Sequence, residues 1–233
     1  MRKYSVDFHT HSNYSPCGNL SSVSYLLEEA KNNGISILSI TDHDTFDQIQ
    51  QAIDLAKEYN IKIVPGFECS SIFENGEKNI ETHVLGYSIK YGEGEKEKLQ
   101  KLIEESSIQI SRNGKEKRIP KIKNAIDFIH KIGGVAILAH PMRVFGYNVE
   151  ELSEILKILF SYGLDGVEVF YSNFVLQNKE ENYYTNLIKD LFYSIPKGKI
   201  ITAGSDHHGY QYYRDNVGEW DDYGIDWDLV EFF

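Results

Sequence analysis

Short apolar segments alternate with amphipathic, helix-like segments along most of the chain. Apolar runs of about four to eight residues between turn residues are typical of buried strands, and longer patterns with helical periodicity are typical of helices. This pattern predicts strands at 5–11, 35–43, 61–72, 81–89, 135–140, 166–170 and 199–206. It predicts helices at 20–33, 46–59, 95–110, 121–132, 150–162 and 179–193. Repeated alternation of strands and helices implies an α/β fold whose parallel sheet is covered by helices.

Seven predicted strands favour a closed or nearly closed α/β barrel, with a doubly wound open sheet as the alternative. The 233 residues suffice for one sizeable core, so we expect a single domain over 1–233. Two segments interrupt the pattern: a turn-rich insertion at 75–79 and a basic stretch at 111–123 (SRNGKEKRIPKIK). The basic stretch is either a solvated connector or a flap that meets an anionic substrate. The acidic and aromatic residues 218–233 are expected to pack as a closing segment, because exposed aromatic side chains would form an apolar patch.

Composition narrows the classes of function. A hydrophobic content of 41% with 25% charged residues indicates an ordered globular protein, and two cysteines are too few for a disulfide framework. The formal net charge of −11 argues against a general nucleic-acid coat or an anionic membrane surface. It is compatible with a phosphorylated substrate if divalent ions reverse the local charge. No apolar run approaches a membrane span and the first residues lack an apolar signal core, so we expect no membrane partner and a cytoplasmic location.

Histidines and carboxylates gather at the predicted strand ends. A lone strand histidine is more often a hydrogen-bonded core residue than a metal ligand. The prediction therefore rests on the presence of several such residues at the ends of different strands. Parallel barrels place their active sites at the C-terminal ends of the strands. Side chains alternate along a strand, so His9 and His11 share a face, and Glu68 lies opposite Cys69. The predicted metal ligands are His9, His11, His43, Glu68, His83, His140, Asp206 and His208.

Imidazole nitrogens and carboxylate oxygens suit zinc, manganese or iron better than calcium. Eight candidate ligands exceed the needs of one ion, so we expect two or three divalent ions. Such clusters activate water as hydroxide and clamp an in-line displacement at phosphorus. The site therefore predicts hydrolysis of a phosphoester by a metal-bound hydroxide.

Five motifs carry a family resemblance: DFHTHS at 7–12, TDHDT at 41–45, PGFE at 65–68, AHP at 139–141 and GSDHH at 204–208. In this order they resemble the polymerase and histidinol phosphatase (PHP) family over nearly the whole chain. The resemblance implies a distorted (β/α)7 barrel with a trinuclear metal site. It assigns one ion to His9, His11, Glu68 and Asp206. It assigns a second ion to Glu68, His83 and His140, and a third to His43 and His208; His83 lies in a further short motif, ETHVLGY.

One position departs from the family pattern. Small stand-alone members usually carry an Asp or His shortly after the His-x-His pair, whereas this chain reads HSNYSPCG with Cys17. Cys17 supplies a thiolate that favours zinc, or the third ion is weak or absent and His43 and His208 bind phosphate directly. Arg143 is either the bidentate partner of a substrate phosphate or a surface arginine. Asp42 and Asp44 flank His43, where we expect them to orient histidines by accepting hydrogen bonds, although Asp44 could also be a ligand.

The predicted function is hydrolysis of a small phosphomonoester or a nucleotide phosphate. One alternative is an exonuclease or oligoribonuclease-type phosphodiesterase acting on short nucleic acids. The other is a non-catalytic metal-binding PHP module of the kind that polymerases carry.

Overall fold

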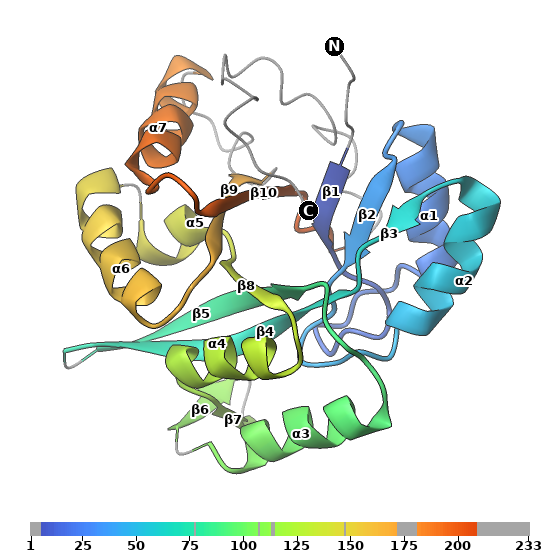
Figure 1. Ribbon diagram of the computed structural model, residues 1–233, viewed down its shortest axis with the longest axis horizontal. Coiled ribbons are helices and arrows are strands. Elements are labelled where there is room, and N and C mark those ends of the chain that lie inside the picture. Colours follow the sequence, from blue (N-terminus) through green and yellow to red (C-terminus); the bar gives the residue numbers. More distant parts are fainter. Residues whose placement is uncertain are drawn as a thin grey trace.

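The computed structural model describes residues 6–208, except 77, 107, 113–114, 147 and 172–180. The expected closing segment at 218–233 therefore lies outside the described residues. In Figure 1, α1 and α2 flank β1, β2 and β3 on one side, and α6 and α7 lie near β9 and β10 on the other. Within the described residues, no helix has the length and apolar character needed to cross a membrane.

The N-terminal part follows the predicted β-α alternation closely. It consists of β1 (Val6–Thr10), α1 (Val23–Asn32), β2 (Ile37–Ile40), α2 (Ile49–Tyr59) and β3 (Lys62–Ile63). The three strands form a parallel sheet in the order β1-β2-β3. Leu26 and Leu27 of α1 pack with Leu38 of β2 and Ala52 of α2, which removes the apolar faces of both helices from water. The side chain of Ser22 caps α1 by accepting a hydrogen bond from the Tyr25 N–H.

The second sheet mixes strand directions, which differs from the expected parallel sheet. Its order is β10-β9-β8-β5-β4. The strands β8 (Val135–Leu138), β9 (Gly166–Tyr171) and β10 (Ile200–Gly204) are parallel. However, β4 (Gly66–Asn75) and β5 (Lys78–Tyr87) form a long antiparallel hairpin, and β5 pairs antiparallel with β8. The predicted strand 61–72 is two strands, β3 and β4, which belong to different sheets.

Five helices accompany this second part of the chain: α3 (Glu93–Glu104), α4 (Ile122–Lys131), α5 (Pro141–Phe145), α6 (Val149–Ser161) and α7 (Glu181–Ser194). The largest apolar cluster joins α4 and α6 to the second sheet and includes Cys69, which is fully buried. The prediction that Cys69 packs in the core, on the opposite side from Glu68, is therefore confirmed.

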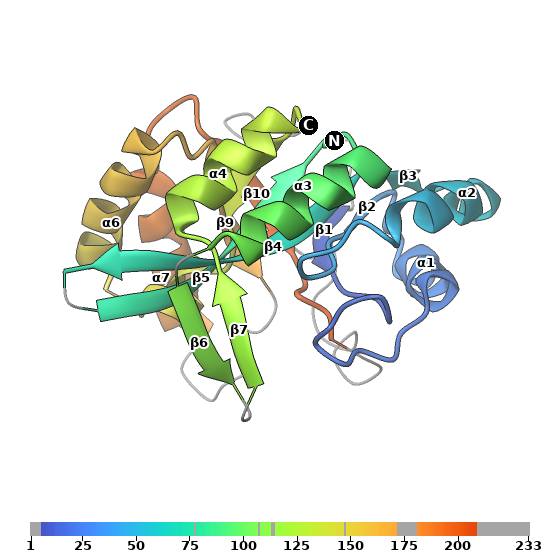
Figure 2. The ribbon, with the colours of Figure 1, turned by 90° about the horizontal axis from the view of Figure 1, so that it is seen from below.

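Most of the basic stretch at 111–123 belongs to a β-hairpin, and its last two residues begin α4. Helix α3 ends at Glu104, and the strands β6 (Ile108–Arg112) and β7 (Lys115–Ile119) form an antiparallel hairpin that projects from the rest of the molecule in Figure 2. The prediction that the helix continues to residue 110 was wrong. Alternating isoleucines before an Asn-Gly pair are a recognised hairpin signal in sequence, and here it outweighs the helical pattern.

The described strands form three separate sheets, and no closed barrel ladder is present among them. The two larger sheets meet through isolated parallel bridges, Thr10 with His207 and His43 with Glu68. These bridges lie at the last residue of β1, just beyond β2 and β10, and within β4. The chain thus brings the ends of strands from both sheets to one place, where most of the predicted ligands lie.

Candidate metal centre

Backbone hydrogen bonds fix the strand ends that carry the predicted ligands. The Asp206 N–H donates to the His9 carbonyl at 2.8 Å, and the His11 N–H donates to the His207 carbonyl at 3.1 Å. On the other side, the Glu68 N–H donates to the Asp42 carbonyl at 3.1 Å. The ligands are therefore held by main-chain pairing between elements far apart in sequence.

Four of the predicted ligands form a buried group, which we call the inner cluster: His9, His11, Glu68 and Asp206. At most 3% of any of these residues is exposed. The His9 Nε2 atom lies 3.3 Å from Glu68 Oε2 and 3.4 Å from Asp206 Oδ1. The His11 Nε2 atom lies 3.2 Å from each of the same two oxygens, and 3.2 Å from His9 Nε2.

This spacing suits a metal ion. Atoms at the corners of a tetrahedron with edges of 3.2 to 3.4 Å lie about 2.0 Å from its centre, which matches zinc–nitrogen and zinc–oxygen bonds. The side-chain oxygens of Glu68 have no well-aligned hydrogen-bond donor among the described residues. Buried oxygens and nitrogens that face one another in this way require a shared cation or shared protons. The inner cluster could therefore hold one divalent ion.

Glu68 also faces a second group of histidines. Its Oε1 atom lies 3.0 Å from His83 Nδ1 and 3.3 Å from His140 Nε2, whereas its Oε2 atom faces the inner cluster. A carboxylate whose two oxygens face different groups is suited to bridging two ions. The structure thus brings His83, from the motif ETHVLGY, to the same carboxylate as His140.

The electrostatics of these groups indicate a site built for positive charge. Burial would raise the pKa of Glu68, but His43, His83 and His9 hold it well below its usual value. Burial would lower the pKa of His11 and of His83, but neighbouring carboxylates raise each to about 9. Without metal, the protein therefore holds protons between imidazoles and carboxylates, where bound cations would replace them.

Three positions at the site have left-handed backbone, which is uncommon for residues other than glycine. The φ angles are 28° at His140, 51° at Asp206 and 52° at Asp44. Such conformations cost on the order of 1–3 kcal/mol each and cluster at functional sites. Gly204 meets a related demand, because a Cβ atom there would collide with His9 Cβ and Glu168 Oε1. Local backbone strain and close packing therefore accompany the orientation of the side chains at this site.

Glu168 in β9 contacts two of the predicted ligands, His9 and His140, although it was not predicted from the sequence. Its carboxylate lies 3.0 Å from His9 Nδ1 and accepts the His140 N–H at 2.8 Å, and it is fully buried. A carboxylate on Nδ1 keeps the proton there and turns the Nε2 lone pair toward the inner cluster. The available signal was a glutamate between two valines in a buried strand.

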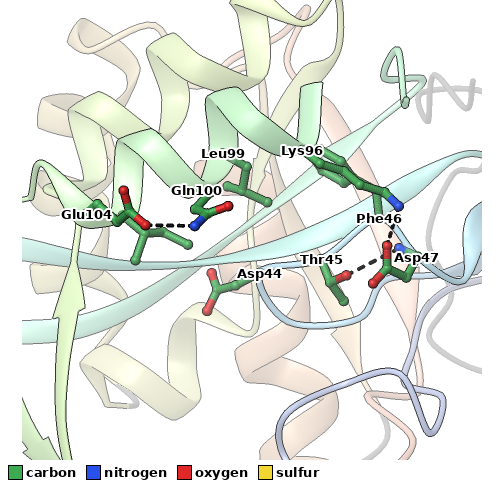
Figure 3. A pocket seen from close by; sticks show the side chains of 9 residues that line it. Asp44, Thr45, Phe46, Asp47, Lys96, Leu99, Gln100 and Glu104 are labelled. Atoms are coloured by element: carbon green, nitrogen blue, oxygen red, sulfur yellow. Dashed lines mark hydrogen bonds and ion pairs between the residues drawn. The ribbon is translucent and has the colours of Figure 1, made fainter. Parts of the chain in front are cut away.

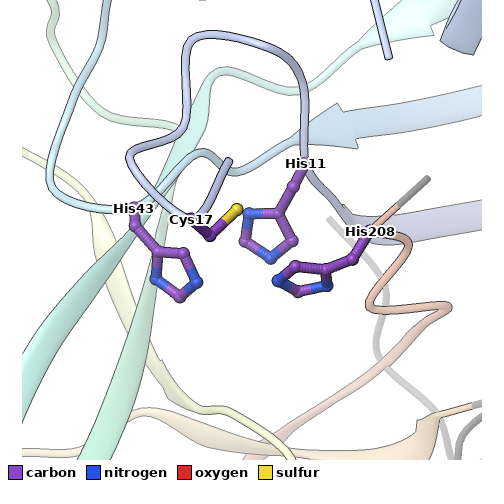
Figure 4. A group of neighbouring side chains, drawn as sticks. All are labelled: His11, Cys17, His43 and His208. Carbon is purple, nitrogen blue, oxygen red and sulfur yellow. The ribbon is translucent and has the colours of Figure 1, made fainter. Parts of the chain in front are cut away.

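A second, more exposed group consists of Cys17, His43 and His208, which we call the outer cluster (Figure 4). One potential ligand atom from each of these residues and from His11 lies within 4.8 Å of the others. Burial would raise the pKa of Cys17, but His208 and Ser15 lower it to about 7. Cys17 therefore lies close to the two histidines that the sequence assigned to a third ion.

The two aspartates beside His43 support the loops around the site. Asp42 accepts hydrogen bonds from the N–H and hydroxyl of Ser12, at 2.6 and 2.5 Å. Asp44 accepts the Ser70 N–H at 2.8 Å and pairs with Lys117 Nζ at 2.7 Å. These contacts differ from the predicted role of orienting histidines, a role that Glu168 has toward His9.

Two cations border the site. Arg143, in α5, lies 2.6 Å from the second oxygen of Asp206, and 56% of its side chain is exposed. Lys117, from the β6–β7 hairpin, reaches Asp44 with 41% of its side chain exposed. The basic stretch therefore contacts the residue next to His43, which its position in the sequence did not reveal.

A cleft of about 350 Å³ opens beside the metal centre, between α3 and the loop after His43 (Figure 3). Asp44, Asp47, Lys96 and Gln100 are among its lining residues. No member of the inner or outer cluster lines it. The cleft and the metal centre share only the neighbourhood of Asp44, so the chemistry is located by the clusters and not by this cleft.

Comparison with known proteins adds the family. The model of the PHP domain matches residues 7–224. The chain belongs to the PHP domain family. An uncharacterized protein of Methanocaldococcus jannaschii is 28% identical over 178 residues, which cover 71% of this PHP chain and 80% of that protein. The phosphoribosyl 1,2-cyclic phosphate 1,2-diphosphodiesterase of Eggerthella lenta is 32% identical over 87 residues, which cover 37% of this chain. That match spans 31% of the length of the diphosphodiesterase.

Two solved structures share the fold of this PHP-domain protein. An amidohydrolase from Chromobacterium violaceum, with bound sulfate and no metal, gives a TM-score of 0.68 at 17% identity, covering 93% of this chain and 90% of the other. A candidate metal-dependent phosphoesterase from Bifidobacterium adolescentis gives a TM-score of 0.66 at 16% identity, covering 99% of this chain and 98% of the other. At these identities the likeness establishes the fold alone.

Proposed function

We propose that this PHP-domain protein is a metal-dependent phosphoesterase that hydrolyses a small phosphomonoester or a nucleotide phosphate. The observation that carries the proposal is the inner cluster. Its nitrogen and oxygen atoms are spaced like the ligands of one ion, and it is buried in a chain of the PHP family. A cation is the simplest group that satisfies so many facing acceptors in a buried site.

The ligand assignment follows the geometry. His9, His11, Glu68 and Asp206 would hold one ion, and Glu68 would share a second with His83 and His140. When bound, such ions activate water and stabilise the charge of the phosphoryl oxygens. Glu168 would hold the ring of His9 in the ligating tautomer.

Arg143 would bind the substrate phosphate. In the structure its guanidinium rests on the Asp206 oxygen that points away from the inner cluster, so it is already at the edge of the metal centre. Its exposed side chain retains donors for a phosphate oxygen, and the guanidinium fork matches phosphate geometry. The Eggerthella relative, which acts on a cyclic phosphate of a ribosyl compound, supports a phosphorylated sugar or nucleotide as the substrate class.

Short nucleic acids are a second candidate, because the β6–β7 hairpin brings Lys117 to the residue beside His43. The net charge of −11 limits such a substrate to a short chain. We also propose that residues 1–233 form one distorted (β/α)7 barrel domain in the cytoplasm. The two bridges between the sheets support the barrel, since they lie where its ladder would close.

A screen with controlled metal content tests the function. Protein stripped with a chelator is reconstituted with zinc, manganese or iron, and then assayed on aryl phosphates, nucleotides, nucleoside bisphosphates and short oligonucleotides. We expect turnover of at least one phosphoester that disappears on stripping and returns on reconstitution. Tight metal binding without turnover on any phosphoester would instead identify a non-catalytic PHP module.

A further inference from the structure

We propose that Cys17 supplies a thiolate sulfur to a third metal site, shared with His43 and His208, and that this site alone in the centre selects zinc and is open to thiol reagents. The inference rests on the proposed metal-dependent function and adds a distinct donor chemistry to one part of the centre.

The loop between β1 and α1 holds Cys17 against His43. The Ser15 hydroxyl accepts the His43 N–H at 3.2 Å and the Cys17 thiol at 3.1 Å. The Ser15 N–H donates to the Ser12 carbonyl at 3.1 Å, and Gly18 continues the turn with φ 81°. One hydroxyl thus ties the cysteine loop to the backbone of a candidate ligand. As a result, the sulfur lies among the rings of His11, His43 and His208 in Figure 4.

The orientation of His208 indicates a ligand. Its Nδ1 atom lies 2.8 Å from the Asp206 carbonyl oxygen, which can only accept a hydrogen bond. The proton of this ring is therefore on Nδ1, and the lone pair of Nε2 is free for the outer cluster. A histidine that ligates a metal usually donates its other ring N–H in this way. Similarly, His43 turns Nδ1 toward Glu68 at 3.1 Å, so its Nε2 atom points elsewhere.

His11 provides an independent observation. This residue is fully buried, and its Nδ1 atom has no hydrogen-bond partner among the described residues. Its Nε2 atom belongs to the inner cluster, whereas in Figure 4 the ring nitrogen beside the side-chain attachment faces the sulfur of Cys17. A buried polar atom without a partner signals a missing ion or charge at that place. An anionic sulfur bound to an ion would supply it.

The donor set sets this site apart from the inner cluster. One sulfur and two imidazole nitrogens favour zinc over manganese, whereas nitrogen and carboxylate ligands accept both. Three protein ligands also leave the fourth position of a tetrahedral ion open, as in catalytic zinc sites and unlike closed structural ones. The third ion would therefore face water or substrate.

Because Cys17 is exposed, its sulfur should also react with thiol reagents. Cys17 is exposed, whereas Cys69 is fully buried in the core. Iodoacetamide should therefore alkylate Cys17 alone: a sulfur–carbon bond forms, the carbon–iodine bond breaks and iodide leaves. Bound zinc should protect the sulfur, because the lone pair that attacks carbon is then held by the metal.

Cobalt substitution of the full chain tests the proposal without an activity assay. Thiolate bound to Co²⁺ gives an intense near-ultraviolet charge-transfer band that nitrogen and oxygen ligands do not give. We expect the band in the wild type and in Cys69→Ser. We expect Cys17→Ser to lose this band and to bind about one ion fewer per chain than the wild type. Cys17→Asp should restore the ion count without the band, because a carboxylate replaces the thiolate.

Alkylation provides a second measurement. Stripped wild-type protein should take up one acetamide group, zinc-loaded protein should resist it, and stripped Cys17→Ser should take up none. Cobalt bound at wild-type stoichiometry without a sulfur band, or an unchanged ion count in Cys17→Ser, would overturn this inference and leave the proposed function intact. A wild-type chain that binds no divalent ion would overturn both.

Discussion

The inner and outer clusters share the histidine-rich centre but are built differently. The inner cluster lies on or directly beyond β1, β4 and β10, is held by main-chain hydrogen bonds and is at most 3% exposed. The outer cluster lies on loops, and its sulfur is exposed. A ligand set on paired strands has little freedom to adjust, whereas a loop ligand can be exchanged without disturbing the sheet. The contrast explains how the chain can carry an unusual cysteine at the loop position.

The two clusters also differ in charge. Interactions with neighbouring histidines hold the pKa of both inner carboxylates, Glu68 and Asp206, below the usual values despite burial. In the outer cluster, burial and the neighbouring histidines hold the pKa of His43 well below its usual value. In the inner cluster the carboxylates are therefore paired with protonated imidazoles, whose protons bound cations would replace, whereas the imidazole of His43 in the outer cluster is neutral.

The largest expected effect comes from removing an inner ligand. Asp206→Ala should lose metal and activity together, and Asp206→Asn should do so while tolerating the left-handed backbone at this position. Mutation of a residue that only supports a ligand typically lowers metal affinity or activity about 10–100-fold, so loss of a ligand itself should lower activity by more than about 100-fold. Metal analysis and turnover of an aryl phosphate measure it.

The control is Asp54→Ala, since Asp54 lies on the surface of α2 with 58% of its side chain exposed. This variant should keep its metal, its activity and its melting temperature. Full turnover by Asp206→Asn at wild-type metal content would disprove the assignment of the inner cluster as the catalytic centre.

A smaller effect is expected when the inner cluster loses its support. Glu168→Gln keeps the shape of the side chain but removes the charge that holds the proton on His9 Nδ1. We expect metal affinity to fall about 10–100-fold with the fold retained, as measured by competition with a chromogenic chelator. Glu154→Gln on the exposed face of α6 is the matched control, because 71% of that side chain is exposed. An unchanged affinity in Glu168→Gln would show that the backbone alone positions His9.

The pH dependence of stability separates the clusters in another way. Without metal, the pKa values of His11 and His83 are raised from 6.5 to about 9 in the folded protein. A raised folded-state pKa stabilises the fold fully below pH 6.5, and this contribution is lost as pH rises through about 9. His43 adds nothing in this window, because its pKa is lowered.

The stripped protein should therefore lose melting temperature between pH 6.5 and about 9, whereas the metal-loaded protein, whose histidines have already released their protons, should change less. Melting curves of both forms across this range measure the difference. Parallel shifts of the two forms would contradict protonated imidazoles in the inner cluster.

The smallest effect is expected at the hairpin. Lys117→Gln removes a half-exposed ion pair, which contributes about 0–1 kcal/mol, so the melting temperature should hardly change. If the hairpin meets an anionic substrate, KM should rise a few-fold with kcat unchanged, and the salt dependence of KM should weaken. Lys123→Gln, whose lysine pairs with Asp127 on the exposed face of α4, should leave both unchanged. An unaltered salt dependence in Lys117→Gln would confine the hairpin to a structural role.

Some of these features were readable from local patterns. The alternation of side chains in a strand placed His9 and His11 on one face, and it separated the buried Cys69 from Glu68. The β-α alternation also located most strands and helices. The hairpin at β6 and β7 was missed because the helical pattern runs into its first strand, and the direction of β5 was missed because local periodicity carries no information on strand orientation.

Contacts between residues far apart in the sequence could not be predicted from local patterns. Glu168 is 159 positions from His9, and Lys117 is 73 positions from Asp44. Each of these residues has an ordinary local context for its element, and it gains a role only from the residue that the fold places beside it. Strand order and register decide such pairs, and both depend on long-range packing.

The sequence by itself determined the kind of ligands and their placement at strand ends, because residue chemistry and the two-residue period of a strand are local properties. The tertiary structure alone decided how those ligands divide into a buried inner cluster and an exposed outer one. It also decided that Glu168 supports His9, and that Cys17 lies against His43 and His208. These features depend on which strand ends lie next to one another. That arrangement is stabilised by packing of the whole core and not by any local segment.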